Sequence, residues 1–221
     1  MPSQTKKKLP SVASAGLDES VRLEILRAAA EAFMKNGFAA TSIDTVAEML
    51  GATKGRVYYY YKSKADLFFD VYREAMRINI ETIKPIAKSD QTPSERLSLM
   101  ANAHLMLILE HFPFQRVATQ GIEMHLSGST TPEQRKALSA LIAARDRYEQ
   151  LFVDVVSEGI ATGEFAGGDP RLKVKAVLGT LNWITIWYRP KSGETRQPPA
   201  QFADEFVSYI TRGLRSPNSQ E

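Results

Sequence analysis

Residues 41–68 read TSIDTVAEMLGATKGRVYYYYKSKADLF, and this stretch decides the fold. At its centre, residues 58–61 are four consecutive tyrosines between basic side chains. An aromatic run favours a β-strand. A strand here would have no partner for its backbone groups, however, because apolar residues recur with helical spacing along nearly all of the chain after Asp18. The run is therefore predicted to be a short helix that begins at Thr53.

A helix turns by about 100° per residue, so it places the four tyrosines in different environments. Val57 and Tyr61 fall on one side and are expected to pack against neighbouring helices. Tyr59 falls opposite them, and Tyr58 and Tyr60 lie on the flanks. The predicted helix thus has one exposed face that is aromatic and basic.

A second short helix is predicted directly before the first. Ser42 can cap it, its apolar residues follow helical spacing, and Gly51 can end it in a tight turn. Two helices over residues 42–49 and 53–60 have the spacing of a helix-turn-helix. In that motif the second helix enters the major groove and the first crosses the DNA backbone.

This stretch resembles the DNA-binding signature of TetR-family transcriptional regulators. The shared features are a threonine-rich start, an alanine-x-x-x-glycine turn and an ending close to YxYF-x-x-K, within a match over residues 18–68. Tyr61 departs from the pattern, because phenylalanine is usual at this packing position. The resemblance implies an all-α protein in which a three-helix DNA-binding unit precedes a larger helical body that binds a ligand and forms a dimer.

By position, the resemblance implies two sets of DNA contacts. The base-facing set is Lys54, Gly55, Arg56 and Tyr59. The phosphate-contacting set is Thr41, Ser42, Thr53, Tyr58, Tyr60 and Lys64. Arg56 suits the O6 and N7 atoms of guanine, and Tyr59 suits a thymine methyl group or a sugar edge. Helix capping alone remains an open alternative for Ser42 and Thr53, as does packing alone for Tyr58.

The helical spacing predicts about nine helices and no strand over the whole chain. The later helices are expected to begin at Ser63 and Ser94 and to cover residues 114–126, 132–163, 171–188 and 200–214. The expected domains are a flexible arm (1–17), a helix-turn-helix domain (18–64), a ligand-binding and dimerisation domain (65–215) and a C-terminal tail (216–221).

The composition excludes several classes of protein. With 221 residues, 43% of them hydrophobic, the chain can build a core and is not disordered. It has no cysteine, which rules out disulfides and thiolate metal sites, and its three histidines have no paired carboxylates beside them. No apolar run approaches the roughly 20 residues that span a bilayer, and the N-terminus is not expected to be a secretory signal. We expect a cytoplasmic protein without membrane contact.

The charge distribution indicates an anionic partner at one end of the chain. The first 64 residues hold ten Lys and Arg against six Asp and Glu, whereas the remainder holds 18 against 19. No glycine-rich phosphate loop or nucleophile elbow is present. We therefore expect a DNA-binding protein that is not an enzyme and carries no cofactor.

The resemblance also implies a small-molecule cavity within residues 85–215. The candidate cavity residues are His104, His111, Phe112, Phe114, Arg116, Trp183, Trp187 and Arg189. A hydrogen-bonded core role is an open alternative for the two histidines, and a dimer interface is one for the two tryptophans. The last two helices are expected to form the homodimer.

Residues 181–190, LNWITIWYRP, resemble a stretch of TetR-type repressors that respond to acyl-CoA thioesters from fatty-acid, aromatic or steroid breakdown. In that case Arg116, Arg189 or nearby lysines would meet the phosphates of CoA at the mouth of the cavity. The expected function is a repressor that leaves a palindromic operator when it binds a small molecule, with acyl-CoA as the leading class. The alternatives are a regulator of efflux or detoxification genes that responds to a hydrophobic or aromatic compound and, more remotely, a ligand-independent DNA-binding structural protein.

Overall fold

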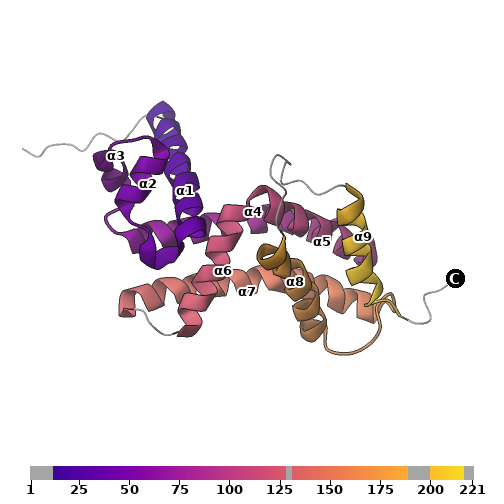
Figure 1. The fold of residues 1–221 in the computed structure, drawn as a ribbon. Coiled ribbons are helices and arrows are strands. Elements are labelled where there is room, and N and C mark those ends of the chain that lie inside the picture. The colour runs from indigo at the N-terminus through magenta and orange to yellow at the C-terminus, as the bar shows by residue number, and fades with distance from the viewer. Residues whose placement is uncertain (1–11, 128–130, 189–199, 217–221) are drawn as a thin grey trace, which may run out of the picture. The chain divides into compact units, whose positions relative to one another are not determined.

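The computed structural model describes residues 12–127, 131–188 and 200–216, which form nine α-helices (Figure 1). The helices are α1 (Val12–Ala40), α2 (Ile43–Leu50), α3 (Lys54–Tyr60), α4 (Lys64–Ala87), α5 (Pro93–Glu110), α6 (Phe112–Ser127), α7 (Pro132–Ala161), α8 (Pro170–Trp187) and α9 (Ala200–Arg212). Within these ranges the β-structure is limited to one isolated bridge, between Phe165 and Arg215. The predicted all-α fold with about nine helices is confirmed.

The chain divides into two compact units, Met1–Val71 and Tyr72–Glu221, with the boundary inside α4. The expected boundary was at the start of this helix. The first residues of α4 belong to the first unit because their apolar side chains complete its core: Phe68 is fully buried and packs edge-on against Phe33 and Phe38. One helix therefore belongs to both units.

The first helix begins earlier than the expected arm allows. It begins at Val12, so residues 12–17 are helical; the rest of the expected arm lies outside the described residues. Near its other end, Gly37 adopts a non-helical conformation (φ 75°, ψ 170°) that favours glycine and makes a kink, and α1 ends at Ala40.

An ion-pair cluster joins the three-helix unit to the start of α4. Arg22 Nη1 and the hydroxyl of Tyr61 each donate a 2.6 Å hydrogen bond to Asp70 Oδ2. Burial, followed by the bond to Asp70, raises the pKa of Tyr61 far above its usual value, so this phenol stays protonated and donates. The tyrosine found where phenylalanine is usual therefore adds a polar link between the end of α3 and α4.

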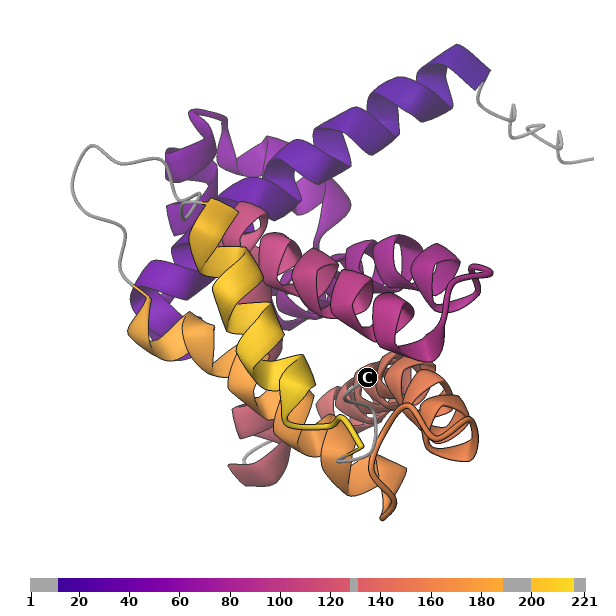
Figure 2. The same cartoon turned by 90° about the vertical axis from the view of Figure 1, so that its right-hand side faces the viewer.

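In the second unit, α5 packs against α7, α8 and α9 (Figures 1 and 2). Helix α5 begins at a capping box formed by Thr92 and Glu95 with Pro93 in its first turn, so its cap lies before the expected Ser94. Helix α6 likewise begins before the expected residue 114, because Pro113 is tolerated in its first turn. Helices α7 and α8 begin within one residue of their predicted starts.

The turn after α7 packs tightly against the segment that follows α9. The backbone of Ala166 donates to Leu214 (2.9 Å), and that of Ser216 donates to Glu164 (3.2 Å). Between these bonds, the buried ring of Phe165 lies against Gly159, where a Cβ atom would overlap the ring. Gly159 is therefore required by close packing.

We expect Gly159→Ala to lower the free energy of unfolding by about 1–3 kcal/mol, because the ring of Phe165 is buried and would have to move. The loss should outweigh the gain in helix propensity from alanine. Urea denaturation measures the difference. Gly167→Ala is the control, since a Cβ there meets nothing within 4 Å. Equal stability of the two variants would contradict the packing role of Gly159.

Candidate DNA-binding surface and ligand cavity

Helices α2 and α3 form the two arms of a helix-turn-helix. Ser42 Oγ accepts a 3.0 Å hydrogen bond from the backbone of Thr45 and so caps α2, and Gly51 ends that helix in the left-handed conformation (φ 65°). Thr53 precedes α3 but makes no side-chain capping bond, and it is exposed. Ser42 therefore caps α2 through its side chain as predicted, whereas Thr53 occupies the N-cap position of α3 without a side-chain bond.

Helix α3 has the orientation that the sequence predicts. Val57 and Tyr61 are buried, whereas Tyr59 is 74% exposed and Tyr58 is 44% exposed. Lys54, Gly55 and Arg56 are exposed as well. Every member of the base-facing set therefore reaches solvent from one short helix.

Acidic side chains hold several of the groups expected to meet DNA. Arg56 Nη2 lies 3.0 Å from Glu24 Oε2, Lys54 Nζ pairs with Asp44, and the hydroxyl of Tyr60 donates to Asp18 over 2.6 Å. The bond to Asp18 is the main cause that raises the pKa of Tyr60 to about 12, and the bond to Asp44 raises the pKa of Lys54. Solvent screens exposed pairs of this kind, so a phosphate or a base edge can replace the carboxylates.

Two residues of the phosphate-contacting set are engaged inside the first unit. Thr41 is 2% exposed, and its hydroxyl donates to the carbonyl of Gly37 over 2.7 Å. Lys64 Nζ donates to the carbonyls of Phe38 (2.7 Å) and Ala39 (3.0 Å). The side chain of Thr41 cannot reach a phosphate in this conformation because it is buried, whereas Lys64 keeps one N–H for DNA.

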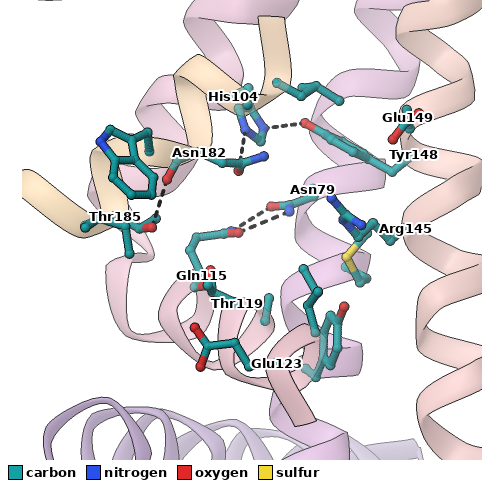
Figure 3. A pocket seen from close by; sticks show the side chains of 18 residues that line it. Asn79, His104, Gln115, Thr119, Glu123, Arg145, Tyr148, Glu149, Asn182 and Thr185 are labelled. Atoms are coloured by element: carbon teal, nitrogen blue, oxygen red, sulfur yellow. Dashed lines mark hydrogen bonds between the residues drawn. The ribbon is translucent and has the colours of Figure 1, made fainter. Parts of the chain in front are cut away.

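A cavity of about 270 Å³ lies in the second unit among α4, α5, α6, α7 and α8 (Figure 3). Two hydrogen-bonded groups line it. The side-chain amides of Asn79 and Gln115 bond each other reciprocally, over 2.7 and 3.2 Å. His104 bonds the hydroxyl of Tyr148 through Nδ1 (2.6 Å) and the side-chain oxygen of Asn182 through Nε2 (3.2 Å).

The partners of His104 assign its tautomer. The amide oxygen of Asn182 can only accept, so Nε2 carries the proton and Tyr148 donates its own proton to Nδ1. Burial lowers the pKa of His104 to about 4, and the bond to Asn182 opposes the shift. The cavity therefore contains a neutral imidazole.

We expect this histidine to make the protein less stable in acid. Between about pH 4 and pH 6.5 the unfolded chain protonates the imidazole and the folded protein does not, so the free energy of unfolding falls as the pH is lowered. The slope from one such group is up to about 1.4 kcal/mol per pH unit. His104→Gln should flatten this dependence in urea denaturation at pH 7, 5.5 and 4.5. His111→Gln, a matched change outside the cavity, should keep the wild-type slope; equal slopes in both variants would refute the assignment.

The chain matches two families that describe the same class of protein. Residues 25–71 match "Bacterial regulatory proteins, tetR family", and residues 90–214 match "Tetracyclin repressor-like, C-terminal domain". The chain belongs to the TetR family. It is a ligand-responsive DNA-binding transcriptional repressor and not an enzyme.

Two relatives are similar over most of the chain. The fatty acid metabolism regulator protein of Bacillus subtilis is 27% identical over 167 residues, which cover 75% of this chain and 82% of that protein. The transcriptional repressor KstR2 of Mycobacterium tuberculosis is 26% identical over 204 residues, which cover 90% and 96%.

Solved TetR structures have the same fold. PfmR from Thermus thermophilus matches with a TM-score of 0.72 and 30% identity, over 87% of this chain and 99% of that one. AibR in complex with isovaleryl coenzyme A and operator DNA matches with a TM-score of 0.69 and 20% identity, over 88% and 98%. FadR from B. subtilis in complex with stearoyl-CoA matches with a TM-score of 0.65 and 22% identity, over 87% and 99%.

The TetR cavity contains only part of the predicted set. His104 and Trp183 line it. His111, Phe112, Phe114, Arg116 and Trp187 do not line it, and Arg189 lies outside the described residues. Helix α5 ends at Glu110, so His111 is its C-cap (φ −113°, ψ 33°) and is not on the helical face that carries His104. Trp187 instead packs on Phe202 and Phe206 of α9.

Polar residues inside apolar stripes were the missed signal for this cavity. Tyr72, Asn79, Gln115, Tyr148 and Asn182 all line it, and each comes from a helix that the sequence predicts. An amide on the apolar face of a helix needs a partner or a ligand. Such residues therefore mark a cavity better than the large aromatics that the sequence suggested.

No group of three or more His, Asp or Glu residues in the described ranges could hold a metal ion. Across the same ranges, no helix has the length and apolarity needed to cross a membrane.

Helix α8 of this TetR body has an exposed stripe. Leu172, Ala176, Thr180, Trp183 and Trp187 are all exposed and follow helical spacing, and Leu172 and Trp183 exceed 60% exposure. Helix α9 lies beside α8 (Figure 2), and its Tyr209 is 85% exposed. Apolar area of this kind marks an interaction surface.

Proposed function

We propose that this protein is a homodimeric repressor that binds a palindromic operator through α3 and leaves it when a small molecule, an acyl-CoA thioester as the leading class, enters the cavity of the second unit. The observation that carries the proposal is the cavity itself, which is lined by hydrogen-bonding groups in the ligand-binding half of a TetR regulator. As a transcriptional regulator that binds DNA, the protein is proposed to act in the cytoplasm.

The DNA contacts of the proposal rest on the exposed face of α3. Lys54, Gly55, Arg56 and Tyr59 face the base edges, and they are accessible in the described conformation. Ser42, Thr53, Tyr58, Tyr60 and Lys64 contact phosphates together with backbone N–H groups. Arg56, Lys54 and Tyr60 exchange their carboxylate partners for DNA.

Helix α4 is the proposed link between ligand and DNA. Tyr72, Met76 and Asn79 of this helix line the cavity, while Leu67 and Phe68 of the same helix are in the core of the DNA-binding unit. A ligand that prefers one position of α4 shifts the equilibrium between DNA-binding states. Because half-sites lie about 34–36 Å apart, a modest shift in a dimer removes tight binding.

The proposed dimer interface is the apolar stripe of α8 together with α9. TetR regulators act as dimers, and this stripe is the exposed apolar surface that a second copy would cover. Gly179 and Thr180 leave a shallow groove beside Trp183, Trp187 and Phe206. Small residues in a groove let a second helix approach closely.

Two observations support the acyl-CoA class. The relative in B. subtilis is a fatty acid metabolism regulator, and two structures of the same fold contain acyl-CoA molecules. In this chain Arg145 lines the cavity. We propose that Arg145, and not the expected Arg116, is the cation that pairs with the phosphates of CoA. The second candidate, an efflux or detoxification regulator, is favoured by the aromatic rings of Tyr72, Tyr148 and Trp183 around the cavity.

The test is release of operator DNA at fixed salt. The operator is first selected from random duplexes with the purified protein, and fluorescence anisotropy then follows its release by acyl-CoA thioesters of increasing size and by the matching free acids. Release by a thioester and not by its acid supports the acyl-CoA proposal. Specific binding that only uncharged aromatic compounds disturb supports the efflux alternative, and binding that no compound disturbs supports the ligand-independent protein.

A further inference from the structure

One buried hydroxyl of a cavity-lining residue has no hydrogen-bond partner. Tyr72 of α4 is fully buried and lines the cavity, and its hydroxyl bonds no described group. The other buried polar groups nearby are satisfied, since Asn79 bonds Gln115 and His104 bonds Tyr148. Buried polar atoms are nearly always paired, so an unpaired hydroxyl in a cavity indicates a group that arrives from outside.

The unpaired hydroxyl acts as a donor. Burial is the main cause that raises the pKa of Tyr72 to about 12, with Arg145 opposing and Asp146 adding to the shift. The phenol is therefore protonated at neutral pH. Its proton needs an acceptor.

Other residues that line the cavity also have N–H groups that are not used in the hydrogen bonds between them. The side-chain amides of Asn79 and Gln115 each use one of their two N–H groups to bond each other. Asn182 bonds His104 through its side-chain oxygen, so this bond leaves the NH₂ group of Asn182 available as a donor. Of the two carboxylates that line the cavity, Glu149 is paired with Lys175 over 2.7 Å and Glu123 is exposed. The buried part therefore suits an uncharged ligand oxygen, which accepts.

We propose that Tyr72 selects effectors whose buried part carries a keto or hydroxyl oxygen, and that it discriminates against hydrocarbon groups of the same shape. This inference rests on the proposed function, because it concerns the effector of the same cavity. The volume also bears on the size of the group: about 270 Å³ is just below the ~300–1,000 Å³ typical of ligand pockets, which suits a small ring or a short chain.

The preference for a ligand oxygen over a methyl group follows from the free-energy cost of leaving the Tyr72 hydroxyl without a partner. A methyl group against Tyr72 leaves the hydroxyl without a partner, whereas an oxygen at the same place accepts its proton. Sites that hydrogen-bond a ligand oxygen reject the analogue without it far more strongly than an apolar site rejects a missing methylene group. Tyr72 is therefore a specificity-determining residue in this proposal.

The experiment uses two pairs of probes that differ only by hydroxyl against methyl. 4-Hydroxybenzoyl-CoA and 4-methylbenzoyl-CoA are compared in operator release, and phenol and toluene are compared in direct binding by calorimetry or ligand-observed NMR. In the wild-type protein we expect the hydroxyl probe to act at a concentration at least about tenfold lower, which corresponds to one good hydrogen bond. In Tyr72→Phe the preference should fall below about threefold while operator affinity is kept.

Tyr148→Phe is the matched control, since it also deletes a buried phenol hydroxyl from the cavity, but one that bonds His104. Without ligand, Tyr72→Phe should melt at or above the wild-type temperature, because it removes an unsatisfied group, and Tyr148→Phe should melt below it. Tyr148→Phe should keep the preference for the hydroxyl probes.

The outcomes separate the two proposals. If phenol binds better than toluene and Tyr72→Phe removes the difference, the inference stands, even if neither thioester releases DNA and the acyl-CoA proposal fails. If the wild-type protein does not distinguish phenol from toluene, or Tyr72→Phe keeps the distinction, the inference is overturned and a water molecule satisfies the hydroxyl. Release by both thioesters without discrimination, together with equal binding of phenol and toluene, overturns the inference and keeps the acyl-CoA function.

Discussion

Thr180→Arg is expected to separate the dimer into monomers and to weaken operator binding by at least about 100-fold, because each monomer then binds one half-site without the effective concentration that the dimer provides. Thr180 is exposed in the middle of the apolar stripe of α8, in the groove beside Trp183. An arginine there places a charge in the interface core, where it has no partner.

The change is designed to leave the folded monomer intact. The side chain of Thr180 is exposed, so its replacement removes no buried contact. Its hydroxyl donates to the carbonyl of Ala176 in the same helix (2.8 Å), and arginine is a good helix former. Size-exclusion chromatography with light scattering measures the mass, anisotropy measures operator affinity, and circular dichroism verifies the fold.

Ser139→Arg is the matched control. Ser139 is also an exposed hydroxyl residue within a long helix, and it donates to the carbonyl of Arg135 four residues earlier (2.9 Å). This variant gains the same charge outside the stripe and should remain a dimer with full operator affinity. A dimeric Thr180→Arg protein would place the interface elsewhere.

Tyr59→Ala and Arg56→Ala have the second-largest expected effect. Each should weaken specific operator binding by about 10- to 100-fold, because a base contact contributes about 1–3 kcal/mol per site. Binding to random DNA should change much less for Tyr59→Ala, since this change removes no charge. Anisotropy with operator and scrambled duplexes, each over a series of salt concentrations, measures both effects.

Two variants separate base contact from charge. Lys35→Ala removes one positive charge from an exposed position on α1, paired with Glu31, and should leave the ratio of specific to random binding unchanged. Glu24→Gln frees Arg56 from its ion pair and should tighten binding to both duplexes. If Tyr59→Ala and Lys35→Ala weaken the two duplexes alike, Tyr59 does not face the bases.

Local features of this protein could be predicted from the sequence because they depend on one segment at a time. The helical spacing and the turn at Gly51 predicted the helix-turn-helix, and the rotation of about 100° per residue predicted that Val57 is buried and Tyr59 exposed. Ser42 was predicted as a cap because capping involves only neighbours in the chain.

The tertiary structure decided which polar groups meet. Glu24 pairs with Arg56 across 32 residues, and the cavity brings Tyr72 and Asn79 of α4 together with Asn182 of α8, a helix far away in the sequence. Spacing within one helix gives the face on which a residue lies but not the partner across the interface, because that depends on how the helices pack. Of the aromatic residues that the sequence favoured for the ligand, Trp183 lines the cavity and Phe112, Phe114 and Trp187 do not. The unpaired hydroxyl of Tyr72 likewise depends on how five helices pack around it.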